Sequence, residues 1–161
     1  MMKNIFKLIL IAASFVVNAQ EGIASFKNNL KTSSSYLKDV IPVVNKETGE
    51  IAFFVVDAKN VYGFKIDTNF KVIDSITSEE KSRKYKVLIG SSASKNNSYR
   101  VFLTDKKQKK FSSVQFSFKY GTTALKEFSL GKNEIFIQTV ISKNQFYLIS
   151  GSKSRNQLYL Y

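Results

Sequence analysis

The chain has 161 residues with no Cys and no His, and its 25 Lys and Arg against 12 Asp and Glu give a net charge of +13. Without Cys and His there can be no disulfides, no Ser-His-Asp or Cys-His catalysis and none of the usual zinc sites. We therefore predict no catalytic, cofactor-binding or metal-ligating residues, and the positive charge favours anionic partners.

The first residues have the order of a secretory signal peptide. Lys3 and Lys7 form a short basic start, residues 5–17 are almost wholly apolar, and Val17-Asn18-Ala19 offers small residues for cleavage. This apolar run is shorter than the roughly 20 residues that a transmembrane helix needs. We expect residues 1–19 to be removed and the protein to be exported to the periplasm, cell surface or extracellular space. Without Lys3 and Lys7, 23 basic and 12 acidic residues leave +11.

Residues 20–38 differ from the rest of the chain. Ile23, Phe26 and Leu30 are spaced like a short helix face, and the polar stretch at 31–36 then breaks the pattern. We expect a linker or a short helix here, ahead of a β-domain at 39–161.

From residue 39 onward the pattern is that of an all-β protein. Short runs rich in Val, Ile, Phe and Tyr alternate with polar turns, which predicts strands. The eleven runs are 40–44, 50–57, 61–67, 71–77, 85–93, 98–105, 111–119, 123–130, 134–142, 145–151 and 157–161. No crossover helix fits between them, so we predict an antiparallel meander. In the seventh run, alternation places Val114, Phe116, Phe118 and Tyr120 on one side.

The strands also repeat. Segments 50–66, 98–118 and 145–161 each have an apolar strand, a polar tip rich in Lys, and a second strand with aromatics. Asp57 and Asp105 end the first strand of the first two segments and stand 48 residues apart. A period in the forties with four strands per unit is typical of propeller blades.

The chain thus resembles the β-propeller families in its strand spacing, from Asp39 to Tyr161. It has no Trp-Asp dipeptide, Gly-His start, kelch double glycine or Asp-box, so no named subfamily is indicated. The resemblance implies blade-like units of four, four and three strands. We expect a partial propeller of about two and a half units that is incomplete at its C-terminal end.

Charge is unequally divided between the two ends of such a meander. The even-numbered turns carry eleven basic and five acidic residues, whereas the odd-numbered turns carry four and three. We predict that one end presents a face for an anionic ligand. Its residues are Lys81, Arg83, Lys84, Lys106, Lys107, Lys109, Lys110, Lys153 and Arg155. The alternative is that lysine-rich tips merely keep the β-edges soluble.

The carboxylates are interpreted as structural. Asp57 and Asp105 recur where strands end, which favours acceptance of hydrogen bonds from turn amides over chemistry. Glu79 and Glu80 stand beside Lys81 and Arg83, as in a solvated charge cluster. Among the aromatics, Tyr62, Tyr99 or Tyr120 could stack on sugars if exposed.

The sequence therefore predicts an exported, non-catalytic binding module of the bacterial envelope or extracellular space. An anionic polysaccharide or an acidic protein is the expected partner, and nucleic acid is disfavoured because no recognition motif accompanies the lysines. Two alternatives remain: the N-terminal part of a larger exported propeller enzyme, and a small outer-membrane β-barrel, which the short strands disfavour.

Overall fold

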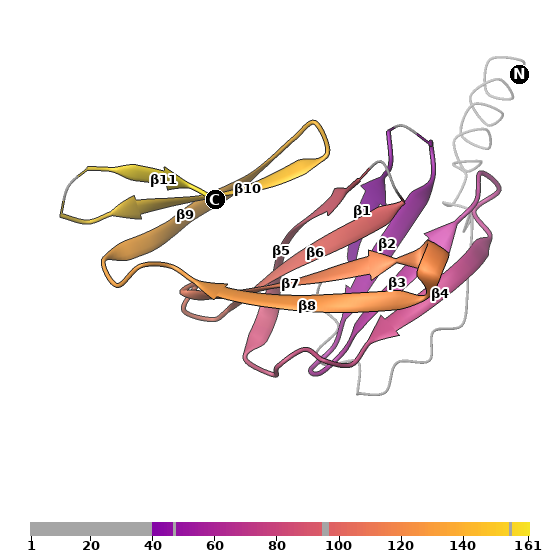
Figure 1. Ribbon diagram of the computed structural model, residues 1–161, viewed down its shortest axis with the longest axis horizontal. Coiled ribbons are helices and arrows are strands. Elements are labelled where there is room, and N and C mark those ends of the chain that lie inside the picture. Colours follow the sequence, from indigo (N-terminus) through magenta and orange to yellow (C-terminus); the bar gives the residue numbers. More distant parts are fainter. Residues whose placement is uncertain (1–39, 47, 95–96, 155) are drawn as a thin grey trace, which may run out of the picture.

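The computed structural model describes residues 40–161 except 47, 95–96 and 155. The expected signal peptide (1–19), the linker or helix (20–38) and Arg155 lie outside the described residues. Within them, eleven strands form three antiparallel sheets that follow one another along the chain (Figure 1). The predicted all-β meander is confirmed, and each of the eleven predicted runs coincides with a strand.

The first two sheets have four strands each and the third has three. Sheet A contains β1 (Val40–Val44), β2 (Ile51–Val56), β3 (Val61–Ile66) and β4 (Val72–Ser78). Sheet B contains β5 (Tyr85–Ala93), β6 (Ser98–Asp105), β7 (Lys110–Ser117) and β8 (Thr122–Ser129). Sheet C contains β9 (Glu134–Ser142), β10 (Gln145–Ser152) and β11 (Leu158–Leu160).

Turn chemistry sets where these strands end. The Oδ1 atom of Asp57 accepts hydrogen bonds from the amides of Lys59 (2.8 Å) and Asn60 (2.6 Å) in the β2–β3 turn. Asp105 Oδ1 does the same for the amides of Lys109 and Lys110 after β6. The prediction that both aspartates bind turn amides is confirmed. Asp57 is also buried, and its other oxygen accepts from the Tyr62 hydroxyl (2.7 Å).

Sheets A and B pack face to face around the main core. Phe54 of sheet A and Phe116 of sheet B are fully buried, with ring centroids 4.9 Å apart. Gly63 permits this approach, because a Cβ there would lie 2.9 Å from Phe54 Cε1 and 3.0 Å from Phe116 Cδ1. Alternation along each strand supplies the rest of the core, since every second side chain points to the same face.

Sheet C packs against the other face of sheet B. The ring of Phe146 stacks on that of Phe102 with centroids 3.8 Å apart and planes 8° from parallel. Leu148 is buried, and Thr139 Oγ1 donates to the Ile89 carbonyl of β5 (3.1 Å). Both sheets that flank sheet B are therefore held to it by side chains.

The outer face of sheet C remains exposed. We define it by Ile135, Ile137, Val140, Leu158 and Leu160, which are all exposed apolar side chains. Pairing brings Leu158 and Ile135 opposite Gly151, and a Cβ on Gly151 would touch Ile137, so these residues share one side of the sheet. This face contrasts with the covered faces of sheet B.

One predicted strand ends earlier than expected. The alternation that placed Tyr120 with Val114 and Phe116 stops at Ser117, where β7 ends. Residues Phe118–Tyr120 instead form a 3₁₀ turn, η2, closed by Gly121 with φ of 62°. Phe118 stays buried, whereas the turn brings Tyr120 to the surface with 70% of its area exposed. The predicted alternation therefore does not extend as far as Tyr120.

Candidate functional site

The predicted basic residues belong to loops at one end of the meander. The loops after β4, β6, β8 and β10 leave their sheets on the side opposite the loops after β1, β3, β5, β7 and β9 (Figure 1). We call their exposed basic side chains the basic loop face. Its members are Arg83, Lys84, Lys106, Lys107, Lys109, Lys110, Lys132 and Lys153.

Lys81 does not belong to this face. Its side chain is only 3% exposed, and its Nζ donates to the carbonyl oxygens of Ala58 (3.0 Å) and Tyr85 (2.9 Å). Burial lowers the pKa of Lys81 to about 8, against the opposing attraction of Asp57. Lys81 thus ties the β2–β3 turn to the start of β5, and it is not available to an external ligand.

Three lysines from three separate loops line one hollow. Lys109 follows β6, Lys132 precedes β9 and Lys153 follows β10, and together they border a space of about 280 Å³ with Asn133 and Ser154. Two of these lysines were predicted to share a face. Lys132 was missed as a site residue, although it lies in one of the even-numbered turns, where one Lys and one Glu balance.

Glu134 also lines the hollow, and other side chains hold its carboxylate. Oε2 accepts from the hydroxyls of Ser150 (2.6 Å) and Tyr161 (2.7 Å), and Oε1 accepts from the Gly131 amide (3.2 Å). The hydrogen bonds from Ser150 and Tyr161 hold the pKa of Glu134 below its ordinary value. Glu134 thus holds the loop that carries Lys132 in place. Its carboxylate also adds one negative charge beside the hollow.

Three further members of the basic loop face lie in the same turn as Lys109. Lys106, Lys107 and Lys110 are exposed in the turn that Asp105 organises. Burial acts to raise the pKa of Asp105, but amide hydrogen bonds from Lys110 and Lys109 outweigh it and lower the pKa. The β8–β9 loop joins this turn through the amide of Leu130, which donates to the Lys109 carbonyl (3.1 Å).

Arg83 and Lys84 extend the face on the side of β8. Both are exposed, and Lys84 Nζ forms an ion pair with Glu127 at 3.1 Å. Hydrogen bonds with Tyr85 and Glu127 raise the pKa of Lys84. Glu127 therefore partly neutralises the charge of Lys84 on this side of the basic loop face.

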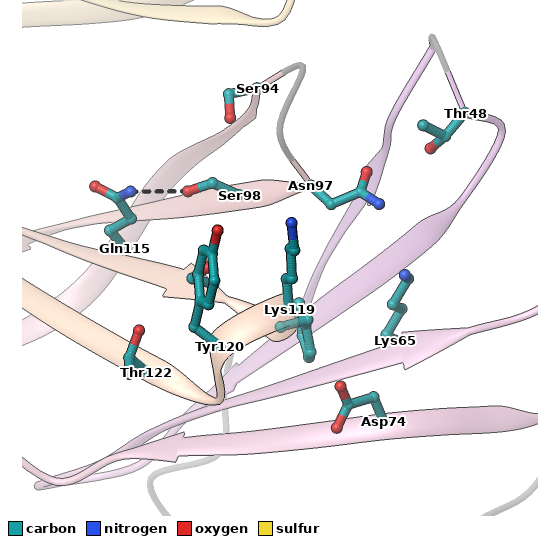
Figure 2. A pocket seen from close by; sticks show the side chains of 12 residues that line it. Thr48, Lys65, Asp74, Ser94, Asn97, Ser98, Gln115, Lys119, Tyr120 and Thr122 are labelled. Atoms are coloured by element: carbon teal, nitrogen blue, oxygen red, sulfur yellow. Dashed lines mark hydrogen bonds between the residues drawn. The ribbon is translucent and has the colours of Figure 1, made fainter.

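A second, larger depression lies at the opposite end of the meander. It has a volume of about 920 Å³ and is bordered by sheets A and B and by the turns after β1, β5 and β7 (Figure 2). Hydroxyl and amide groups dominate its walls, and Tyr120 stands at its rim. We call this depression the polar cleft.

The described residues contain no group of three or more Asp and Glu side chains that could hold a metal ion. Glu79 and Glu80 are exposed. In the part of the chain that the structure describes, no helix has the length and apolar character needed to cross a membrane.

Comparisons with known proteins give no match among protein-family models, curated proteins or solved structures.

Proposed function

We propose that this protein is an exported, non-catalytic binding module that docks an anionic polysaccharide through the basic loop face. The observation that carries the proposal is the hollow of about 280 Å³ bordered by Lys109, Lys132 and Lys153. These residues are far apart in sequence, and the fold brings them together.

The geometry favours an extended anion over a small one. Arg83, Lys84, Lys106, Lys107 and Lys110 continue the positive surface beyond the hollow, so a chain of sulfate or carboxylate groups could contact several cations at once. Each exposed ion pair contributes only about 0–1 kcal/mol. Useful affinity therefore needs many contacts, which a polymer provides. Salt should weaken this binding, because ions screen the attraction between charges over a Debye length of about 10 Å at 0.1 M.

We further propose that the three sheets are blade-like units of a partial propeller. The first strands contact one another, β1 with β5 and β5 with β9, and the fourth strands β4 and β8 also meet. Successive sheets in a propeller pack in this way around a centre. The outer face of sheet C then corresponds to the face of sheet A that contacts sheet B and to the face of sheet B that contacts sheet C.

Heparin chromatography tests the proposed function. We expect the wild-type protein to be retained, and Lys109→Gln with Lys132→Gln and Lys153→Gln to weaken binding at least about tenfold, since three modest contacts are lost. The matched control replaces Lys46, Lys71 and Lys143 by Gln. These three exposed lysines lie in odd-numbered turns, Lys46 and Lys71 in sheet A and Lys143 in sheet C.

The control removes the same net charge from the other end of the molecule. If it lowers the NaCl concentration for elution as much as the first triple variant, binding follows overall charge and the proposal fails. It also fails if the first triple variant elutes with the wild type. Retention on polygalacturonate would extend the result from sulfate to carboxylate groups.

A further inference from the structure

The polar cleft is built from parts of the chain that are distant from the basic loop face. Thr48 comes from the β1–β2 turn, Asn97 from the β5–β6 turn, and Lys65 and Asp74 from the paired strands β3 and β4. Its volume of about 920 Å³ falls within the range of ligand pockets, which is roughly 300–1,000 Å³. The cleft is therefore large enough for one or two sugar rings.

Tyr120 presents an aromatic ring at the rim of this cleft. The ring is 70% exposed, whereas Tyr62 and Tyr99 are buried. The turn that carries Tyr120 is anchored in the core, because Phe118 is buried and makes an edge-on contact with Tyr99, with ring centroids 5.6 Å apart. Gly121 with its positive φ closes the turn. The backbone that carries Tyr120 is thus held by a buried residue and a closed turn, which lowers the entropy lost when a ligand stacks on the exposed ring.

The polar groups of the cleft are held in place before any ligand arrives. Gln115 accepts a hydrogen bond from Arg100 (2.6 Å) and donates one to the Ser98 hydroxyl (2.9 Å), as Figure 2 shows for the second bond. Asn97 Oδ1 accepts from the amide of buried Asn45 (3.2 Å). That bond orients the Asn97 side chain, which extends into the space between Thr48 and Lys119 (Figure 2).

Charge in the cleft is nearly balanced. Lys65 forms a salt bridge with Glu50, Asp74 supplies a carboxylate, and Lys119 Nζ lies 5.3 Å from the centroid of the Tyr120 ring. This balance contrasts with the basic loop face and disfavours a highly charged ligand. A neutral sugar suits the combination, because its apolar ring face can cover an aromatic ring while its hydroxyls bind amides and carboxylates.

We propose that the polar cleft binds a neutral saccharide, with Tyr120 as the stacking platform and Asn97, Gln115 and Asp74 as hydrogen-bonding groups. This site is separate from the basic loop face and takes a different class of ligand. The protein would then contact glycan at both ends of its sheets.

Affinity gel electrophoresis under acidic native conditions tests this site. The gels contain laminarin, dextran, galactomannan or xyloglucan, all of them neutral. We expect at least one to retard the wild-type protein. Tyr120→Ala should weaken that retardation about tenfold or more, and Tyr120→Phe should preserve it because the ring remains. Phe70→Ala is the control, since it removes another exposed aromatic ring at the same end.

Three results would overturn the proposal: retardation by none of the four polysaccharides, equal retardation of Tyr120→Ala and wild type, or equal weakening by Phe70→Ala. Far-UV circular dichroism confirms that each variant is folded. The variant that lacks Lys109, Lys132 and Lys153 separates the two sites. It should keep its retardation by the neutral polysaccharide even where heparin binding is lost.

Discussion

At the scale of single residues, Lys81 shows how a charged side chain can serve the fold. Its Nζ donates to two backbone carbonyls, and burial lowers its pKa from 10.5 to about 8. In the unfolded chain Lys81 keeps its proton up to about pH 10.5, so between these pH values the unfolded state binds more protons. The contribution of Lys81 to stability should therefore increase as pH rises through this window.

Replacing Lys81 by Met tests this reasoning. At pH 7 the free energy of unfolding should fall by about 1–3 kcal/mol, because the Ala58 and Tyr85 carbonyls lose their donor. The difference between wild type and variant should grow from pH 7.5 to pH 9.5, as measured by urea denaturation at each pH. Groups that titrate alike in both proteins cancel in this difference. A constant or shrinking difference would show that the pKa of Lys81 is not lowered.

At the scale of elements, the sheets differ in how their faces are covered. Phe116 lies fully buried between sheets A and B, whereas Leu160 on the outer face of sheet C is 65% exposed. We expect Phe116→Ala to cost about 3–5 kcal/mol of unfolding free energy. Leu160→Ala should change it by no more than about 0.5 kcal/mol.

Urea denaturation of both variants at low protein concentration measures this contrast. If Leu160→Ala were as costly as Phe116→Ala, the outer face of sheet C would have to be packed in solution. Leu88→Ala offers a further comparison within the main core.

The strands could be predicted because their signal is local. Runs of β-branched and aromatic residues, with Asp57 and Asp105 at strand ends, are sufficient to locate them. The exposure of Tyr120 could not be predicted from alternation, because the 3₁₀ turn depends on how Phe118 fits the core. Burial of Lys81 likewise depends on two carbonyls, one of them 23 residues away.

The candidate site was predicted only in part for the same reason. The alternation of turns between the two ends of a meander places Lys109 and Lys153 at one end, since the order of strands alone determines this. Whether a lysine in such a turn is exposed, paired or buried depends on side-chain packing. Two residues are examples. The ion pair of Lys84 with Glu127 and the position of Lys132 at the hollow follow from the three-dimensional arrangement and not from the strand order.

At the scale of the whole molecule, the meander separates two kinds of surface. The loops after even-numbered strands carry the basic loop face, and the turns after odd-numbered strands help to form the nearly neutral polar cleft. Since the net charge of the chain is +13, long-range attraction draws any polyanion toward the protein. The local arrangement of basic side chains then determines which part of the surface binds that polyanion.

The most direct test is amide chemical-shift mapping by NMR with a heparin-derived hexasaccharide at about 0.1 M salt, where charges beyond about 10 Å are screened. We predict that shifts concentrate at 106–110, 131–134 and 153–154, around the hollow lined by Lys109, Lys132 and Lys153. Shifts spread evenly over the surface, or centred on the turns that hold Lys46, Lys71 and Lys143, would contradict the proposed function.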